Sequence, residues 1–142
     1  MSELHLVLGI AVLGSNALAG AWGAACWLRG EPSIAFWYLL RTAQAIVVLQ
    51  VLVGGVLIAI GESAPDDLHV IYGLSPLLVS LVSEGMRVRA MQRELEPIDE
   101  PDSLERPEQV ALARRIVLGE MGVMTIGAIL IVTLSLRAMQ SG

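Results

Sequence analysis

The sequence predicts an all-α integral membrane protein that folds as a four-helix antiparallel bundle. Hydrophobic residues make up 55% of the 142 residues and charged residues only 16%, against roughly 25% charged residues in a typical soluble protein. The mean hydropathy is +0.69. Four apolar segments, each long enough for the roughly 20 residues that cross a bilayer, use most of the chain. We therefore expect a single transmembrane domain over residues 1–142 and no separate soluble domain.

The first two helices are predicted at about residues 4–28 and 34–60. The stretch "RGEPS" between them contains a glycine and a proline, which end the first helix and make the two helices an antiparallel pair. No basic region precedes the first segment, and its length of about 25 residues exceeds the roughly 7–15 residues of a signal-peptide core. We therefore expect this segment to be retained as a membrane span.

The third and fourth helices are predicted at about residues 68–90 and 110–137. Asp66 or Asp67 is expected to cap the third helix, because a carboxylate can accept a hydrogen bond from the first turn. The stretch "RELEPIDEPDSLERPEQ" between the two helices holds seven acidic residues and three prolines. Such a composition cannot bury a core, so residues 91–109 are predicted to form an exposed, partly disordered cytoplasmic loop.

The distribution of basic residues predicts the orientation in the membrane. All nine are arginines, and only Arg137 falls on one side of the predicted membrane. The others are Arg29, Arg41, Arg87, Arg89, Arg93, Arg106, Arg114 and Arg115. Because positively charged loops stay in the cytoplasm, we expect a multi-pass protein of the inner (plasma) membrane with both termini outside.

Each of helices 1 and 3 carries a stripe of small and polar residues on one face, at about 100° per residue. In helix 1 the stripe is His5, Gly9, Val12, Asn16, Ala19, Gly20, Gly23 and Trp27. In helix 3 it is His69, Tyr72, Gly73, Pro76, Ser80, Ser83, Glu84 and Arg87. Small residues let helices approach closely and polar groups need partners that lipid does not offer, so both stripes are expected to face the bundle.

Both stripes begin with a histidine at the outer end. Because helices 1 and 3 run in the same direction, His5 and His69 are expected at similar depth, facing each other across the bundle. Two such imidazoles can take the two axial positions of a b-type haem or share another metal ion. Arg137 is the cation available at this side to meet a haem propionate. An interfacial or hydrogen-bonding role for the two histidines is the alternative.

A second polar layer is predicted toward the cytoplasmic side. It comprises Arg41 and Gln44 on helix 2, Glu84 and Arg87 on helix 3, and Glu120 on helix 4. Carboxylates inside a membrane are costly and usually paired, so we expect an Arg41–Glu120 pair or an Arg87–Glu84–Glu120 network. Gln50, near the middle of helix 2, is expected to bond Asn16 on helix 1.

Several function classes are excluded or unsupported. The single cysteine, Cys26, excludes an intramolecular disulfide and with it the four-helix membrane thiol oxidoreductases. No basic patch supports nucleic-acid binding. No Gly-rich phosphate loop, HExxH motif or nucleophile with a base at catalytic spacing is found, so nothing in the sequence asserts an enzyme.

The run "RTAQAIVVLQVLVGGVLIAIGESAPDDLHVIYGL", from Arg41 to Leu74, resembles part of one four-helix half of the haem A synthase family. In that family, too, a helix bearing glutamine and glycine leads through an outer loop to a helix bearing a histidine. Family members have eight helices in two halves, with haem-ligating histidines on the second and fourth helices of each half. Here the histidines begin helices 1 and 3 and there is no second half. The resemblance implies haem ligation by His5 and His69, and it does not carry over the synthase reaction.

Three functions remain open at this point. The first is a small b-type haem protein that transfers electrons or serves as a membrane subunit of a respiratory complex, with His5 and His69 as ligands. The second is a non-catalytic accessory subunit whose glycine stripes pack against other membrane subunits or a second copy of the chain. The third is a small proton-coupled transporter that uses Glu84 and Glu120. The lipid bilayer is a partner in all three.

Overall fold

The computed structural model describes residues 2–62 and 67–140, which form four long α-helices, one short 3₁₀ turn and no β-strand. The helices are α1 (Ser2–Arg29), α2 (Ile34–Ala59), α3 (Asp67–Leu95) and α4 (Arg106–Gln140), and the turn is η1 (Pro101–Ser103). Each helix is long and apolar enough to cross a membrane. The all-α fold class with four helices is confirmed. Asp66, one of the two residues expected to cap α3, lies outside the described residues.

The predicted acidic loop over residues 91–109 is wrong at both ends. Helix α3 continues to Leu95 and α4 begins at Arg106, so the connection shortens to residues 96–105 and contains η1. Local hydrogen bonds explain the early start of α4: the Glu105 carbonyl accepts from the backbone N–H of Glu108 at 2.9 Å, and the Glu108 carboxylate accepts from the Glu105 N–H at 3.3 Å. This reciprocal pairing resembles a capping box, in which side chain and backbone satisfy each other's unpaired groups.

The link between α1 and α2 forms as the sequence predicts. Gly30 ends α1 with a φ of +66°, a left-handed conformation that glycine adopts without strain. Ser33 then caps α2, because its hydroxyl accepts from the backbone N–H of Phe36 at 3.2 Å. The indole N–H of Trp22 donates to the same hydroxyl at 3.0 Å, which ties the start of α2 back to α1.

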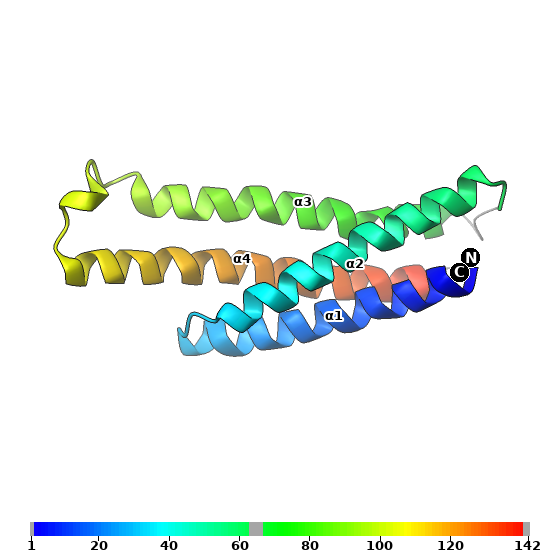
Figure 1. Ribbon diagram of the computed structural model, residues 1–142, viewed down its shortest axis with the longest axis horizontal. Helices are drawn as coiled ribbons and strands as arrows, with labels where there is room; N and C mark the ends of the chain where they lie inside the picture. The colour runs from blue at the N-terminus through cyan, green and yellow to red at the C-terminus, as the bar shows by residue number, and fades with distance from the viewer. Residues whose placement is uncertain (1, 63–66, 141–142) are drawn as a thin grey trace.

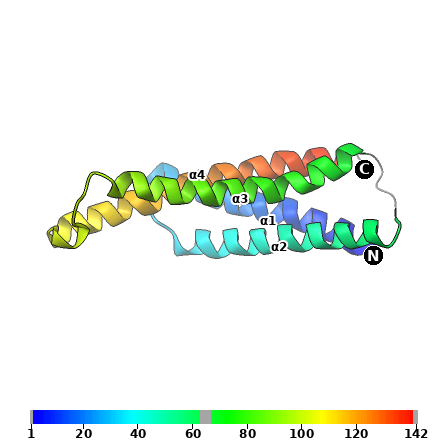
Figure 2. The same cartoon turned by 90° about the horizontal axis from the view of Figure 1, so that it is seen from above.

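Helix α4 is the central element of the arrangement. It packs along both α1 and α3, α2 packs mainly on α1, and α2 and α3 touch each other much less. Figure 1 shows α3 and α4 side by side along the long axis, with α2 rising from beside α1 and crossing obliquely in front of α4, and Figure 2 shows α1 between α2 and the α3–α4 pair. The α3–α4 hairpin extends well beyond the α1–α2 link. The four helices therefore form an open antiparallel bundle.

The two small-residue stripes face the interior, as predicted. The buried residues of α1 include Val12, Asn16, Ala19, Gly20 and Gly23, and those of α3 are Pro76, Ser80 and Ser83. Trp27, at the end of the α1 stripe, is an exception because it is 40% exposed.

Both stripes pack against α4. A Cβ placed on Gly23 would lie 2.3 Å from the Thr125 hydroxyl, and one placed on Gly127 would lie 2.3 Å from the Ser83 hydroxyl. At Gly23 the close partner is thus α4 of the same chain, whereas a Cβ placed on Gly73 of the α3 stripe would meet no atom within 4 Å.

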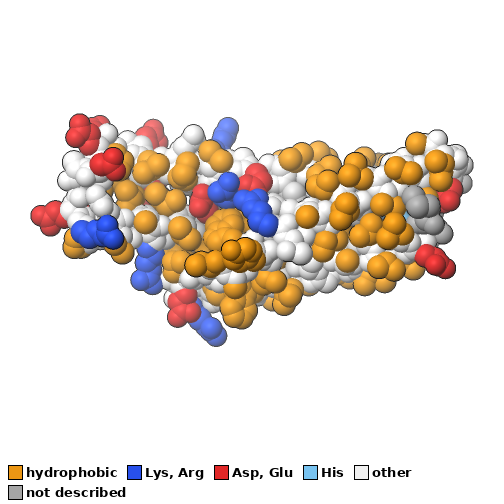
Figure 3. Space-filling view, in the orientation of Figure 1, with side chains coloured by type: hydrophobic (Ala, Val, Ile, Leu, Met, Phe, Trp, Pro, Cys, Tyr) orange, Lys and Arg blue, Asp and Glu red, His pale blue; other side chains and the backbone are white. Residues whose placement is uncertain are grey.

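The two ends of the bundle differ in chemistry. We call the end with His5 and His69 the histidine end and the opposite end, with Arg29, Arg89 and Arg114, the arginine end. Figure 3 shows both arginines and acidic residues over the arginine end and the middle of the molecule, then a mainly apolar stretch, and acidic side chains alone at the tip of the histidine end on this face. The bundle thus has the asymmetry on which the predicted orientation depends.

Candidate functional site

The histidine end brings His5 and His69 together. Their ring centres are 6.1 Å apart and the ring planes are inclined by 56°. Helices α1 and α3 enter the bundle from this same end, so each histidine occupies the first turns of its helix at a similar level. The expected juxtaposition of the two imidazoles is present in the structure.

His5 is held by α2 rather than by its own helix. The amide N–H of Gln50 donates to Nε2 of His5 at 3.3 Å, and the absence of a Cβ on Gly54 lets the imidazole lie against α2. A ring nitrogen that accepts a hydrogen bond carries no proton, so the neutral imidazole is protonated on Nδ1. Nδ1 of His5 and Oε1 of Gln50 are buried, and neither has a hydrogen-bond partner within the described residues. Unmatched buried polar atoms are rare, so this donor and this acceptor remain available for a further hydrogen bond.

His69 is oriented by α4. Its Nδ1 donates to the backbone carbonyl of Ala138 at 3.2 Å, a contact that fixes the direction of the ring. One turn further along α3, the Tyr72 ring lies under the guanidinium of Arg137, 5.9 Å from the ring centre. Arg137 is exposed and reaches the same end of the bundle as the histidines, where a cation was expected for a propionate.

The expected bond between Asn16 and Gln50 is not formed. Asn16 is buried, and its amide donates to the Val12 carbonyl of its own helix at 2.9 Å. Gln50 instead reaches His5. Whether Gln50 bonds His5 or Asn16 depends on how α2 is rotated about its axis. The sequence of α2 alone does not predict this rotation.

The second polar layer forms a continuous charged network across α2, α3 and α4. Arg87 donates to the Glu84 carboxylate at 2.9 Å and to the Glu120 carboxylate at 3.0 Å. Arg41 forms an ion pair with Glu84, and the Gln44 amide donates to the same carboxylate at 2.9 Å. Of the two arrangements predicted, the Arg87–Glu84–Glu120 network is therefore present, whereas Arg41 pairs with Glu84 and not with Glu120.

This network is balanced and largely shielded. Two arginines face two glutamates, so the four formal charges cancel, and Trp37 adds a cation–π contact with Arg87 at 5.9 Å. Side-chain exposure falls from 50% at Arg41 to 12% at Glu120. Gln44 belongs to the network as predicted, because it lies three residues after Arg41 and therefore on the same helical face. The network ties α2 to α3, two helices that otherwise touch little.

Within residues 2–62 and 67–140, no group of three or more His, Cys, Asp or Glu residues is arranged to hold a metal ion. The two histidines are thus the candidate metal ligands. Because they supply only two ligands, the other ligands of the metal ion would have to come from the bound cofactor. Haem meets this condition, because the porphyrin supplies four nitrogens and leaves two axial positions.

The fold and these two polar clusters define a class: a small all-helical protein whose four helices are suited to membranes, with a histidine pair at one end. Comparison with protein-family models, with curated proteins and with solved structures found no match to this chain.

Proposed function

We propose that the chain is a four-span protein of the inner (plasma) membrane, with both termini outside, that binds one b-type haem between His5 and His69. It would transfer electrons on its own or as a membrane subunit of a respiratory complex. The orientation follows from the arginine distribution, since the positive-inside rule keeps the arginine end in the cytoplasm. The haem would then lie near the outer face of the membrane.

The spacing of the two imidazoles carries the haem proposal. A metal–imidazole bond is about 2.0–2.1 Å long, so two imidazoles on opposite sides of one metal ion have ring centres roughly 6–6.5 Å apart. The observed separation of 6.1 Å agrees with this value. Two imidazoles at this separation, one from α1 and one from α3, would be close enough to hold one haem iron between them.

The surrounding residues support distinct roles at such a site. The Ala138 carbonyl, which accepts from Nδ1 of His69, would hold that imidazole in a fixed tautomer and direction, as partners of metal-bound histidines do. Ligation through Nε2 of His5 would replace the hydrogen bond from Gln50. Arg137 would pair with a propionate at the exposed edge of the site, and bound haem would supply one-electron redox chemistry.

Absorption spectroscopy of the protein purified from haem-replete cells tests the proposal. The dithionite-reduced protein is expected to show the sharp α band of a six-coordinate b-type haem, and His5→Ala and His69→Ala are each expected to lose it. Leu6→Ala and Leu68→Ala are matched controls, because these exposed neighbours point away from the pair, and they should keep the band. Gln50→Ala should also keep it, since ligation does not use the amide. A colourless wild-type protein would refute haem binding.

The orientation needs a separate test. Glu62 and Asp102 are exposed residues at opposite ends of the bundle, and Cys26 is buried. In intact cells a membrane-impermeant thiol reagent is expected to label Glu62→Cys, and to label Asp102→Cys only after permeabilisation. The reverse pattern would overturn the proposed orientation and leave the haem proposal standing.

A structural role is the second candidate, and the charged network is the observation that favours it. Each carboxylate of Glu84 and Glu120 is bonded to an arginine of the same chain, so the intramembrane charges are satisfied without substrate or proton. A stable, haem-free protein in the absorption experiment would select this role over electron transfer.

A further inference from the structure

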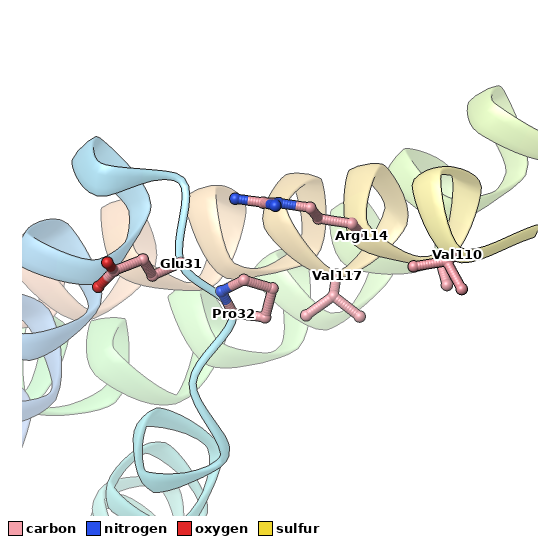
Figure 4. Close-up of a pocket in the computed structure, with 6 residues that line it drawn as sticks. Glu31, Pro32, Val110, Arg114 and Val117 are labelled. Atoms are coloured by element: carbon pink, nitrogen blue, oxygen red, sulfur yellow. The ribbon is translucent and has the colours of Figure 1, made fainter. Parts of the chain in front are cut away.

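An open hollow lies at the arginine end, where the α1–α2 link meets the side of α4. It is a shallow depression with a volume of about 550 Å³, and it is lined by Glu31, Pro32, Val110, Ala113, Arg114 and Val117. Figure 4 shows the Arg114 side chain reaching along α4 toward the link, with Val110 and Val117 beside it, while the Glu31 carboxylate points away from Arg114. The hollow therefore combines an apolar floor with one guanidinium at its edge.

The position of Arg114 is fixed by the link. Its Nη2 donates to the Gly30 carbonyl at 2.7 Å, and Gly30 is held in its left-handed conformation at the end of α1. A guanidinium has five N–H donors arranged to match phosphate, and this hydrogen bond uses one of them. The lining holds one arginine, Arg114, and one glutamate, Glu31, whose carboxylate points away from Arg114 (Figure 4), so Arg114 is the charge that a ligand in the hollow would meet.

The level of the hollow matches a membrane surface. Helices α1 and α2 end at the link, whereas α4 continues past it, so the hollow lies where the first two spans leave the membrane. Trp22 and Trp27 near the end of α1 and Tyr38 near the start of α2 are 48%, 40% and 74% exposed, a placement typical of interfacial aromatic residues. A molecule in the hollow would have its polar part at headgroup level and its apolar part beside Val117.

We infer that this hollow binds one anionic phospholipid, with the headgroup phosphate on Arg114 and the start of an acyl chain along Pro32 and Val117. Phospholipid fits better than a soluble ligand because the lining is apolar on the membrane side and cationic at the surface. An anionic lipid fits better than a zwitterionic one because the Arg114 guanidinium lies at the edge of the hollow, whereas the Glu31 carboxylate points away from it. The inference rests on the proposed membrane placement and is independent of the haem.

Native mass spectrometry of the full chain, released from nanodiscs containing phosphatidylcholine and phosphatidylglycerol, tests the inference. Wild type is expected to retain one phosphatidylglycerol. Arg114→Gln should weaken its retention about fivefold or more, the effect of one arginine near an anionic headgroup. Arg93→Gln is the matched control, because Arg93 is exposed at the same level of the hairpin, next to the residue that pairs with Arg115, and does not line the hollow. It should retain the lipid as wild type does.

A second variant keeps the test decisive if Arg114→Gln fails to fold. Ala113→Trp fills the hollow from an exposed position, keeps Arg114, and should also lose the lipid. Unchanged retention in both variants, equal loss in Arg93→Gln, or displacement of the lipid by inorganic phosphate would each overturn the inference. If alkaline carbonate extracted the wild-type protein from membranes, the membrane placement would be refuted. Absence of the α band from the wild-type protein would refute only the proposed haem binding.

Discussion

Gly14 and Gly23, both in α1, are expected to respond in opposite ways to replacement by alanine. A Cβ on Gly23 would lie 2.3 Å from the Thr125 hydroxyl and 2.5 Å from Cε2 of Phe36, and both of these residues are almost completely buried. A Cβ on Gly14 would have no neighbouring atom within 4 Å. Gly23 lies where α1, α2 and α4 meet, so neither neighbour can move without displacing a helix.

The magnitudes follow from two terms. Replacing glycine by alanine inside a helix stabilises it by roughly 0.5–1 kcal/mol at either position. Overpacking a well-packed interior costs typically about 1–3 kcal/mol, and this term applies to Gly23 alone. We therefore expect Gly14→Ala to raise the free energy of unfolding by about 0.5–1 kcal/mol and Gly23→Ala to lower it by up to about 2.5 kcal/mol.

The measurement is reversible unfolding in mixed micelles with increasing dodecyl sulfate, followed by far-UV circular dichroism. Because the helix term is common to both variants, the difference between them reports the steric term directly. If the two variants agree within about 0.5 kcal/mol, the usual error of comparing separate sites, then α4 does not pack on α1 as described.

Two further predictions use the same assay. Arg87→Met leaves the Glu84 and Glu120 carboxylates without the guanidinium that joins them, and is expected to destabilise the protein by about 3 kcal/mol. Arg115→Gln, which removes an exposed ion pair, should change stability by less than about 1 kcal/mol, and equal losses would contradict a shielded network. Ser33→Ala removes the cap of α2 and the partner of the Trp22 indole. It should cost about 1 kcal/mol and shift the tryptophan emission; unchanged emission would show that the indole contact is absent.

The helices and their directions could be predicted because they follow from the apolar composition of the four segments and from the helical spacing of their polar residues. Four apolar segments separated by "RGEPS" and by two polar connections leave little choice of element type, and the histidines at 5 and 69 follow at one end from the direction of α1 and α3. The ends of α3 and α4 could not be predicted in the same way. Acidic residues and prolines signal a loop by composition, but the Glu105–Glu108 pairing starts α4 locally, before the apolar segment begins.

Partner choice within the polar layers depends on how helices rotate and cross. Glu84 and Glu120 were expected to need arginines, and both have them, because an unpaired carboxylate in this setting is costly. Which arginine serves which carboxylate depends on the oblique path of α2, which brings Arg41 to Glu84. The same path brings Gln50 to His5 and leaves Asn16 to bond its own helix.

The central place of α4 has a physical cause that the stripes on α1 and α3 reveal only in part. Those stripes show that α1 and α3 each need a closely packed neighbour. Helix α4 can pack against both because it carries small residues on two faces: Gly122 lies against Trp27 of α1, and Gly127 lies against Ser83 of α3. A partner subunit that used either stripe would have to displace α4 and expose the buried Met121 and Met124 with it. The close contacts at Gly23, Gly122 and Gly127 therefore report how this chain packs on itself and leave the exposed apolar outer faces of the helices as the surface available to any other membrane protein.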